Sequence, residues 1–136
     1  MSSSLTRGAF PATRMRRLRR SAARRALVRE THLSAADLIY PVFILEGKNR
    51  RESISSMPGI ERLSIDQLLQ DAKAWVDVGI RCLALFPVVD QSQKSLMAEA
   101  AYASDGLVQR AVNTVKTEFP DLLIMTDVAL DPYTTH

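Results

Sequence analysis

The fold is decided by eight almost continuously apolar residues, LIYPVFIL, at positions 38–45. They are rich in β-branched and aromatic side chains, which is typical of a strand buried on both faces of a parallel sheet. Two further stretches have the same character, CLALF at 82–86 and LLIMT at 122–126. The stretches begin about forty residues apart, and we therefore expect three strands of one sheet.

The segments between these strands carry signals for loops and helices. Residues 46–58 are mostly polar and predict a loop. The run Ser64-Ile65-Asp66-Gln67 fits a capping box, and Gly79 predicts the end of the helix that it opens. A second helix is predicted over about 105–119, ended by Pro120. This alternation of strand, helix and strand predicts parallel βαβ units, as in flavodoxin-like sheets and (β/α)₈ barrels.

Length and composition narrow the class of protein. The chain has 136 residues, of which 46% are hydrophobic and 24% charged, so that disorder throughout is excluded. No apolar run approaches the roughly 18 residues that a membrane span needs, and no membrane partner is expected. The single cysteine, Cys82, cannot form an internal disulfide, and a cytoplasmic, reducing location is expected.

Charge is distributed very unevenly along the chain. Residues 1–30 hold nine arginines and one acid, Glu30, whereas the rest carries a net charge of −5. We expect a basic arm over 1–33 and a globular α/β body over 34–136. The arm fits a solvated or partner-bound tail, a nucleic-acid tail or a mitochondrial presequence. No aromatic residue that could stack on bases lies within 14–25.

The residues best suited to catalysis or metal binding follow the third predicted strand. Asp127 is placed where barrel enzymes carry catalytic groups, although strand-end aspartates are also common turn residues. Asp127, Asp131 and His136 could together offer oxygen and nitrogen ligands to a metal ion. We expect Cys82 to be a small core residue, and no catalytic role is assigned to Lys94.

The chain resembles the N-terminal part of the porphobilinogen synthase family, also called δ-aminolevulinic acid dehydratase. The resemblance covers essentially all of residues 14–136. The stretches that carry it, in one order, are RMRRLRR (14–20), LIYPVFIL (38–45), RESISSMPGIERL (51–63), LALFPV (83–88) and TDVALDPYTTH (126–136).

The resemblance implies an N-terminal arm and the first three strands of a TIM (β/α)₈ barrel that is incomplete in this chain. It implies a lyase (hydro-lyase) that condenses two molecules of 5-aminolevulinate to porphobilinogen, with loss of water, in tetrapyrrole and heme biosynthesis. The arm would then embrace a neighbouring subunit in a homo-oligomer, typically an octamer, and no nucleic-acid partner is expected.

The family's site residues are carried over only where the motifs match. Asp127 corresponds to an active-site aspartate for proton transfer or substrate orientation, and Phe86 to an aromatic of the substrate pocket. Where zinc-dependent relatives have cysteines, this chain has Ala129 and Asp131, so no thiolate zinc site is expected. Magnesium is expected instead, with a monovalent cation as a further option, and Asp131 is the candidate metal ligand.

A complete barrel needs eight strand–helix units, and the family's two Schiff-base lysines are expected beyond these residues. The chain alone is therefore expected to be inactive. The alternative interpretation is a non-catalytic module whose basic arm binds RNA or an acidic protein.

Overall fold

The computed structural model describes residues 8–14 and 16–136. The chain divides into two compact units, and the boundary along the sequence falls between Leu33 and Ser34. The first unit contains a 3₁₀ turn, η1 (Arg17–Arg19), and the short helix α1 (Ala22–Leu27). Ser21 caps α1, because its hydroxyl accepts a hydrogen bond from the Arg24 amide at 3.3 Å. No helix among the described residues is long and apolar enough to cross a membrane.

The second unit is built on a five-stranded sheet in the order β2-β3-β1-β4-β5. Its strands are β1 (Ile39–Leu45), β2 (Arg51–Ser53), β3 (Glu61–Leu63), β4 (Cys82–Val88) and β5 (Leu123–Thr126). β1, β4 and β5 are parallel neighbours in chain order. The three predicted strands and their parallel arrangement are therefore confirmed.

The prediction of a loop over 46–58 was wrong in part. Residues Arg51–Ser53 form β2, which pairs antiparallel with β3 and makes the sheet mixed. β3 in turn lies parallel to β1, through the pairs Phe43–Arg62 and Ile44–Leu63. Each strand of this hairpin has only three residues, which is too short for an alternating apolar pattern to appear in the sequence.

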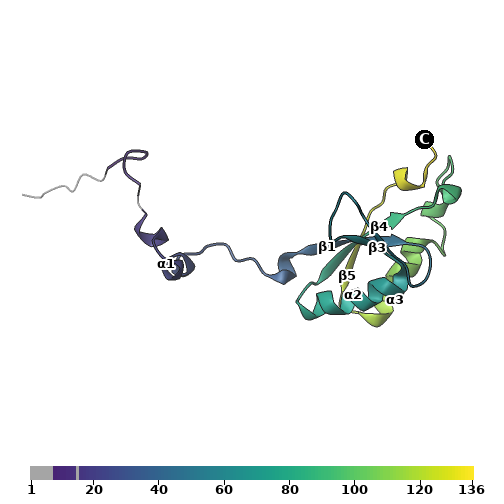
Figure 1. Cartoon of the computed structure of the whole chain (residues 1–136), viewed down its shortest axis with the longest axis horizontal. Coiled ribbons are helices and arrows are strands. Elements are labelled where there is room, and N and C mark those ends of the chain that lie inside the picture. Colours follow the sequence, from purple (N-terminus) through teal and green to yellow (C-terminus); the bar gives the residue numbers. More distant parts are fainter. Residues whose placement is uncertain (1–7, 15) are drawn as a thin grey trace, which may run out of the picture. The chain divides into compact units, whose positions relative to one another are not determined.

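Two helices, α2 (Ile65–Asp77) and α3 (Leu107–Glu118), pack on the same face of the sheet (Figure 1). Alternate residues of β1 and β4 point to this face, because successive side chains of a strand point to opposite sides. The core therefore joins strand and helix side chains, namely Val42, Ile44, Leu63, Leu68, Ala72, Ile80, Leu83, Leu85, Ala111, Val115 and Leu122. Short 3₁₀ turns complete the unit: η2 (Ala35–Asp37), η3 (Gln91–Gln93), η4 (Glu99–Ala101) and η5 (Asp131–Tyr133).

The predicted ends of α2 are confirmed, but the predicted capping box is not. Ser64 is the N-cap residue, yet its hydroxyl accepts from the Arg50 amide at 3.0 Å and contacts Asp66 at 2.7 Å. At the other end Gly79 adopts a φ of 99°, and the Ile80 amide donates to the Trp75 carbonyl. This is a Schellman motif, in which the left-handed position favours glycine.

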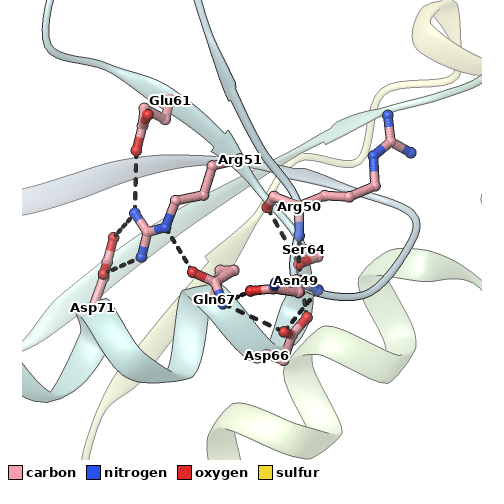
Figure 2. Close-up of polar contacts among 8 residues, drawn as sticks. All are labelled: Asn49, Arg50, Arg51, Glu61, Ser64, Asp66, Gln67 and Asp71. Atoms are coloured by element: carbon pink, nitrogen blue, oxygen red, sulfur yellow. Dashed lines mark hydrogen bonds and ion pairs between the residues drawn. The ribbon is translucent and has the colours of Figure 1, made fainter.

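Polar contacts bind the β2–β3 hairpin to α2 (Figure 2). Arg51 of β2 contacts both carboxylate oxygens of Asp71, at 2.6 and 3.0 Å, and donates through Nε to Gln67 Oε1 at 2.6 Å. Arg51 also reaches Glu61 of β3 at 3.1 Å. Asn49 accepts from Gln67 Nε2 at 3.0 Å. Long-range side-chain contacts thus hold a hairpin that is too short to be stable alone.

Candidate active site

The carboxyl-terminal ends of β1, β4 and β5 meet at one edge of the sheet, because these strands are parallel. Asp127 follows directly after the last residue of β5 and is exposed at this edge. Thr126 is in register with Leu85, so that Asp127 and Phe86 are each the next residue along neighbouring strands. The structure therefore brings together the two positions that the sequence singled out.

Phe86 and its neighbour Phe43 form an aromatic pair on the sheet. Phe43 is in register with Phe86, and their ring centroids lie 5.9 Å apart at an interplanar angle of 42°. Ile44 and Leu85, the adjacent residues along the strands, belong to the core beneath the helices. Because side chains alternate, both rings lie on the opposite face of the sheet from the helices.

The loop after β5 carries Asp131 and ends in residues that contact the loop after β4. Asp131 is exposed and begins η5, and its carbonyl accepts from the Thr134 hydroxyl at 3.2 Å. The Ser95 amide donates to the Tyr133 carbonyl at 3.0 Å, next to a parallel bridge between Ser95 and Thr134. The two loops are thus joined by their main chains.

Tyr133 is the one residue that this loop buries, with a relative exposure of 9%. Its burial raises the pKa of the phenol. The sequence contains this tyrosine within the quoted TDVALDPYTTH stretch, but its burial was not predicted. A large aromatic side chain within a loop was the available signal, since such side chains commonly anchor loops by filling a gap.

Two hollows lie beside this loop. One, of about 260 Å³, is lined by Asp127 together with residues of α3 and the loop after β4, among them Tyr102 and Gln109. The other, of about 440 Å³, lies by the start of α3, where Arg110 forms an ion pair with Glu46. Tyr133 lines both hollows.

Whether these residues fit a metal ion depends on the ligands that they offer. Asp127 and Asp131 supply carboxylate oxygens, which suit hard cations such as magnesium. Over residues 8–14 and 16–136, no group of three or more His, Cys, Asp or Glu side chains lies close enough together to hold an ion. The described residues therefore offer hard ligands but not a full coordination sphere. Cys82 begins β4 and so lies at the end of the sheet opposite to Asp127, away from these carboxylates.

The basic arm has a local structure of its own. Arg25 donates to the Arg19 carbonyl at 2.9 Å and so fastens α1 to η1. A hollow of about 710 Å³ on this unit is lined by Arg16, Arg17, Arg19, Arg20 and Arg25. All of these arginines are exposed, which fits a segment whose charges face solvent or an acidic partner.

Comparison with known proteins identifies the family. The model of the family described as "Delta-aminolevulinic acid dehydratase" matches residues 12–136. The delta-aminolevulinic acid dehydratase of Bradyrhizobium diazoefficiens is 45% identical over 125 residues, which cover 92% of this chain and 35% of that protein. The Methanothermus sociabilis protein of the same name is 44% identical over 127 residues, covering 93% and 39%.

A solved structure agrees with these matches. The delta-aminolevulinic acid dehydratase (porphobilinogen synthase) of Toxoplasma gondii, crystallised with the reaction product porphobilinogen, superposes with a TM-score of 0.85 at 44% identity. The match covers 90% of this chain and 35% of that one, so that the chain spans little more than a third of the length of its relatives. The chain belongs to the delta-aminolevulinic acid dehydratase family.

Proposed function

We propose that this chain forms the N-terminal part of a porphobilinogen synthase, a lyase that condenses two molecules of 5-aminolevulinate to porphobilinogen with loss of water. Family membership over residues 12–136 supports the proposal, as does the porphobilinogen bound to the Toxoplasma gondii relative. The observation that carries it is the place of Asp127, directly after the carboxyl end of β5 and, like Phe86 on β4, one residue past the Leu85–Thr126 pair. The alternative of a non-catalytic arm module has no comparable support.

In this proposal β1, β4 and β5 are the first three strands of a (β/α)₈ barrel. Their sheet order follows the chain, and α2 and α3 both lie on one face, as the helices of a barrel do. The other face is apolar and open: Ile39, Leu123 and Met125 are each about half exposed or more. That face corresponds to the barrel interior, which the side chains of further strands would fill.

Asp127 would act on the substrate by moving a proton or by orienting an amino group. An exposed carboxylate at the strand end can accept a proton or a hydrogen bond from an ammonium group, provided that the substrate lies within about 3 Å. Phe86 would form an apolar wall beside it, because its ring lies on the face of the sheet that would line the barrel interior. The family's two Schiff-base lysines would come from outside these residues, and neither Lys94 nor another lysine here is proposed to replace them.

Magnesium is the proposed cation, with Asp131 as a ligand either directly or through water. The chemistry of the available side chains supports this choice, since carboxylate oxygens prefer hard cations. Thiolate zinc is not proposed, because the positions expected to carry cysteine hold Ala129 and Asp131. When bound, the cation would polarise a substrate oxygen or a water molecule.

The arm is proposed to hold subunits together in a homo-oligomer, of which an octamer is the expected form, in the cytoplasm. Electrostatics supports an acidic partner for the arm. Residues 1–30 include nine arginines and a single acid, whereas residues 31–136 carry a net charge of −5. A second copy of the body would therefore attract the arm, and more strongly at low ionic strength.

A chimaera tests the proposal. Residues 1–136 would be fused to the C-terminal part that the Bradyrhizobium diazoefficiens relative has beyond the match, and porphobilinogen formation from 5-aminolevulinate would be measured. We expect activity in the fusion and none in the 136-residue chain alone.

Substitution of Asp127 in the fusion then tests the site. Asp127→Asn should lower kcat by roughly 10²–10⁴-fold, the usual contribution of a positioned acid or base. Asp121→Asn is the matched control, since Asp121 is an exposed aspartate just before the opposite end of β5. A fully active Asp127→Asn fusion, or an inactive parent fusion that is folded, would contradict the proposal.

A further inference from the structure

Tyr133 occupies an unusual place for a loop residue. It is 9% exposed, whereas the aspartates of the same loop, Asp127 and Asp131, are exposed. In the part of the chain that the structure describes, no hydrogen bond of its hydroxyl is present. Tyr133 is therefore held by the packing of its ring and by two main-chain hydrogen bonds: its amide donates to the Leu130 carbonyl, and its carbonyl accepts from the Ser95 amide.

Tyr133 lines two hollows that differ in their other lining residues. The hollow of about 260 Å³ is lined by Asp127, and the hollow of about 440 Å³ is lined by Arg110 and Glu46, which form an ion pair. Tyr133 is in the wall of both. Truncating the side chain would therefore remove part of the lining of both hollows, including the one that Asp127 lines.

The main-chain contacts of this residue restrain the same segment. Ser95 donates to the Tyr133 carbonyl, and Ser95 and Thr134 form a bridge. Ser95 is itself held by a side-chain hydrogen bond to Glu99. The segment after Asp127 thus has one fixed point at β5 and a second at Tyr133, so that the chain between them spans only residues 127–132.

We propose that Tyr133 is a positioning residue for Asp127: its buried ring and its main-chain bond to Ser95 fix the loop after β5, and hence the orientation of the Asp127 carboxylate. The inference rests on the proposed function, because it assumes that Asp127 works on the substrate. It assigns the effect to the ring and not to the hydroxyl. Tyr133→Phe should therefore behave like the parent, and Tyr133→Ala should not.

The first test uses the 136-residue chain and needs no activity. Amide hydrogen exchange should show the Ser95 amide protected in the parent and in Tyr133→Phe, and at least about tenfold less protected in Tyr133→Ala. Tyr102→Ala is the matched control, since Tyr102 lines the Asp127 hollow but is 65% exposed. An unprotected Ser95 amide in the parent chain would overturn the anchor, whatever the fate of the variants.

The second test uses the active fusion and a double-substitution cycle. Tyr133→Ala should lower kcat by roughly 10–10²-fold, the effect of a displacement of about 1 Å at a reacting group, with KM changed less than about twofold. Combined with Asp127→Asn, it should cause no further loss, because it acts through Asp127.

A purely structural role would instead lower the activity of both backgrounds by the same factor, and that result would overturn the proposal. So would a Tyr133→Phe fusion as impaired as Tyr133→Ala. If the fusion is inactive while the Ser95 amide is protected as expected, the failure lies in the proposed function and not in the anchor.

Discussion

The contacts of Arg51 allow a quantitative test of what holds the β2–β3 hairpin against α2. The perturbation is Arg51→Met, which keeps the aliphatic stem but removes the guanidinium. It deletes the two contacts with Asp71, the contact with Glu61 and the bond to Gln67 Oε1. These partners differ in burial: the Asp71 side chain is 29% exposed, whereas Gln67 is only 6% exposed.

The expected cost follows from this difference. A partly exposed ion pair contributes about 0.5–1 kcal/mol. The buried Gln67 oxygen loses its donor, and an unsatisfied buried acceptor costs about 1–3 kcal/mol. We therefore expect Arg51→Met to lower the free energy of unfolding by about 1.5–4 kcal/mol. Asp71→Asn removes only the ion pair and should cost about 0.5–1 kcal/mol.

Urea unfolding of the 136-residue chain measures these costs. Trp75 is the only tryptophan and lies in α2, with its ring centroid 4.5 Å from that of Tyr40, so that its fluorescence reports on this unit. At a slope of about 2 kcal/mol per molar urea, Arg51→Met should lower the midpoint by about 0.8–2 M. Arg50→Met is the matched control and should cost under about 0.5 kcal/mol, because the Arg50 side chain is 52% exposed. Equal costs for Arg51→Met and Asp71→Asn would refute the reasoning.

Three further predictions concern single positions. The hydroxyl of Ser64 lowers the pKa of Asp66. The stability that this contact contributes is therefore fully present above the ordinary aspartate pKa and is lost as the pH falls through the lowered pKa. Asp66→Asn lacks this contribution, so its urea midpoint should fall less than that of the parent between pH 6 and pH 3. Gly79→Ala should cost about 1–2 kcal/mol in urea unfolding, because φ is 99° and the new Cβ would lie 3.3 Å from that of Ala35. Ala98 is buried and has a φ of 53°. In thermal unfolding, the stability of Ala98→Gly should stay within about 1 kcal/mol of the parent, because relief of backbone strain offsets the lost methyl group. Ala98→Val should cost about 2 kcal/mol or more.

The elements that could be predicted are those whose signals are local. The strand at 39–45 appears as an unbroken apolar run, and the end of α2 is marked by Gly79. The second helix, predicted over about 105–119, is observed as Leu107–Glu118. The hairpin could not be predicted in this way, because its position depends on the edge of β1 and on Arg51, twenty residues before its partner Asp71.

Ser64 shows the same limit on a smaller scale. Sequence alone correctly makes it the N-cap residue of α2 but predicts that Gln67 completes a capping box. In the fold both side chains are engaged elsewhere, Ser64 with Arg50 and Gln67 with Arg51 and Asn49. Local capping chemistry was displaced by tertiary contacts that the spacing of residues does not reveal.

The candidate site divides in a similar way. Asp127 could be singled out because it lies at the end of an apolar strand, and Phe86 because it matches an aromatic residue of the family that the chain resembles; parallel pairing brings the two strand ends together. Their roles remain predictions. The burial of Tyr133 depends on two loops meeting, through Ser95 and Thr134, and nothing in the sequence near either residue indicates that contact.

The two borders of the sheet differ in how well they resist unwanted pairing. β2, at one border, is three residues long and includes the charged side chains of Arg51 and Glu52, a composition that discourages another strand from docking. β5, at the other border, reads Leu-Ile-Met-Thr, and its Leu123 side chain is 63% exposed. Self-association of this chain in solution should therefore occur through β5, and Leu123→Lys should prevent it.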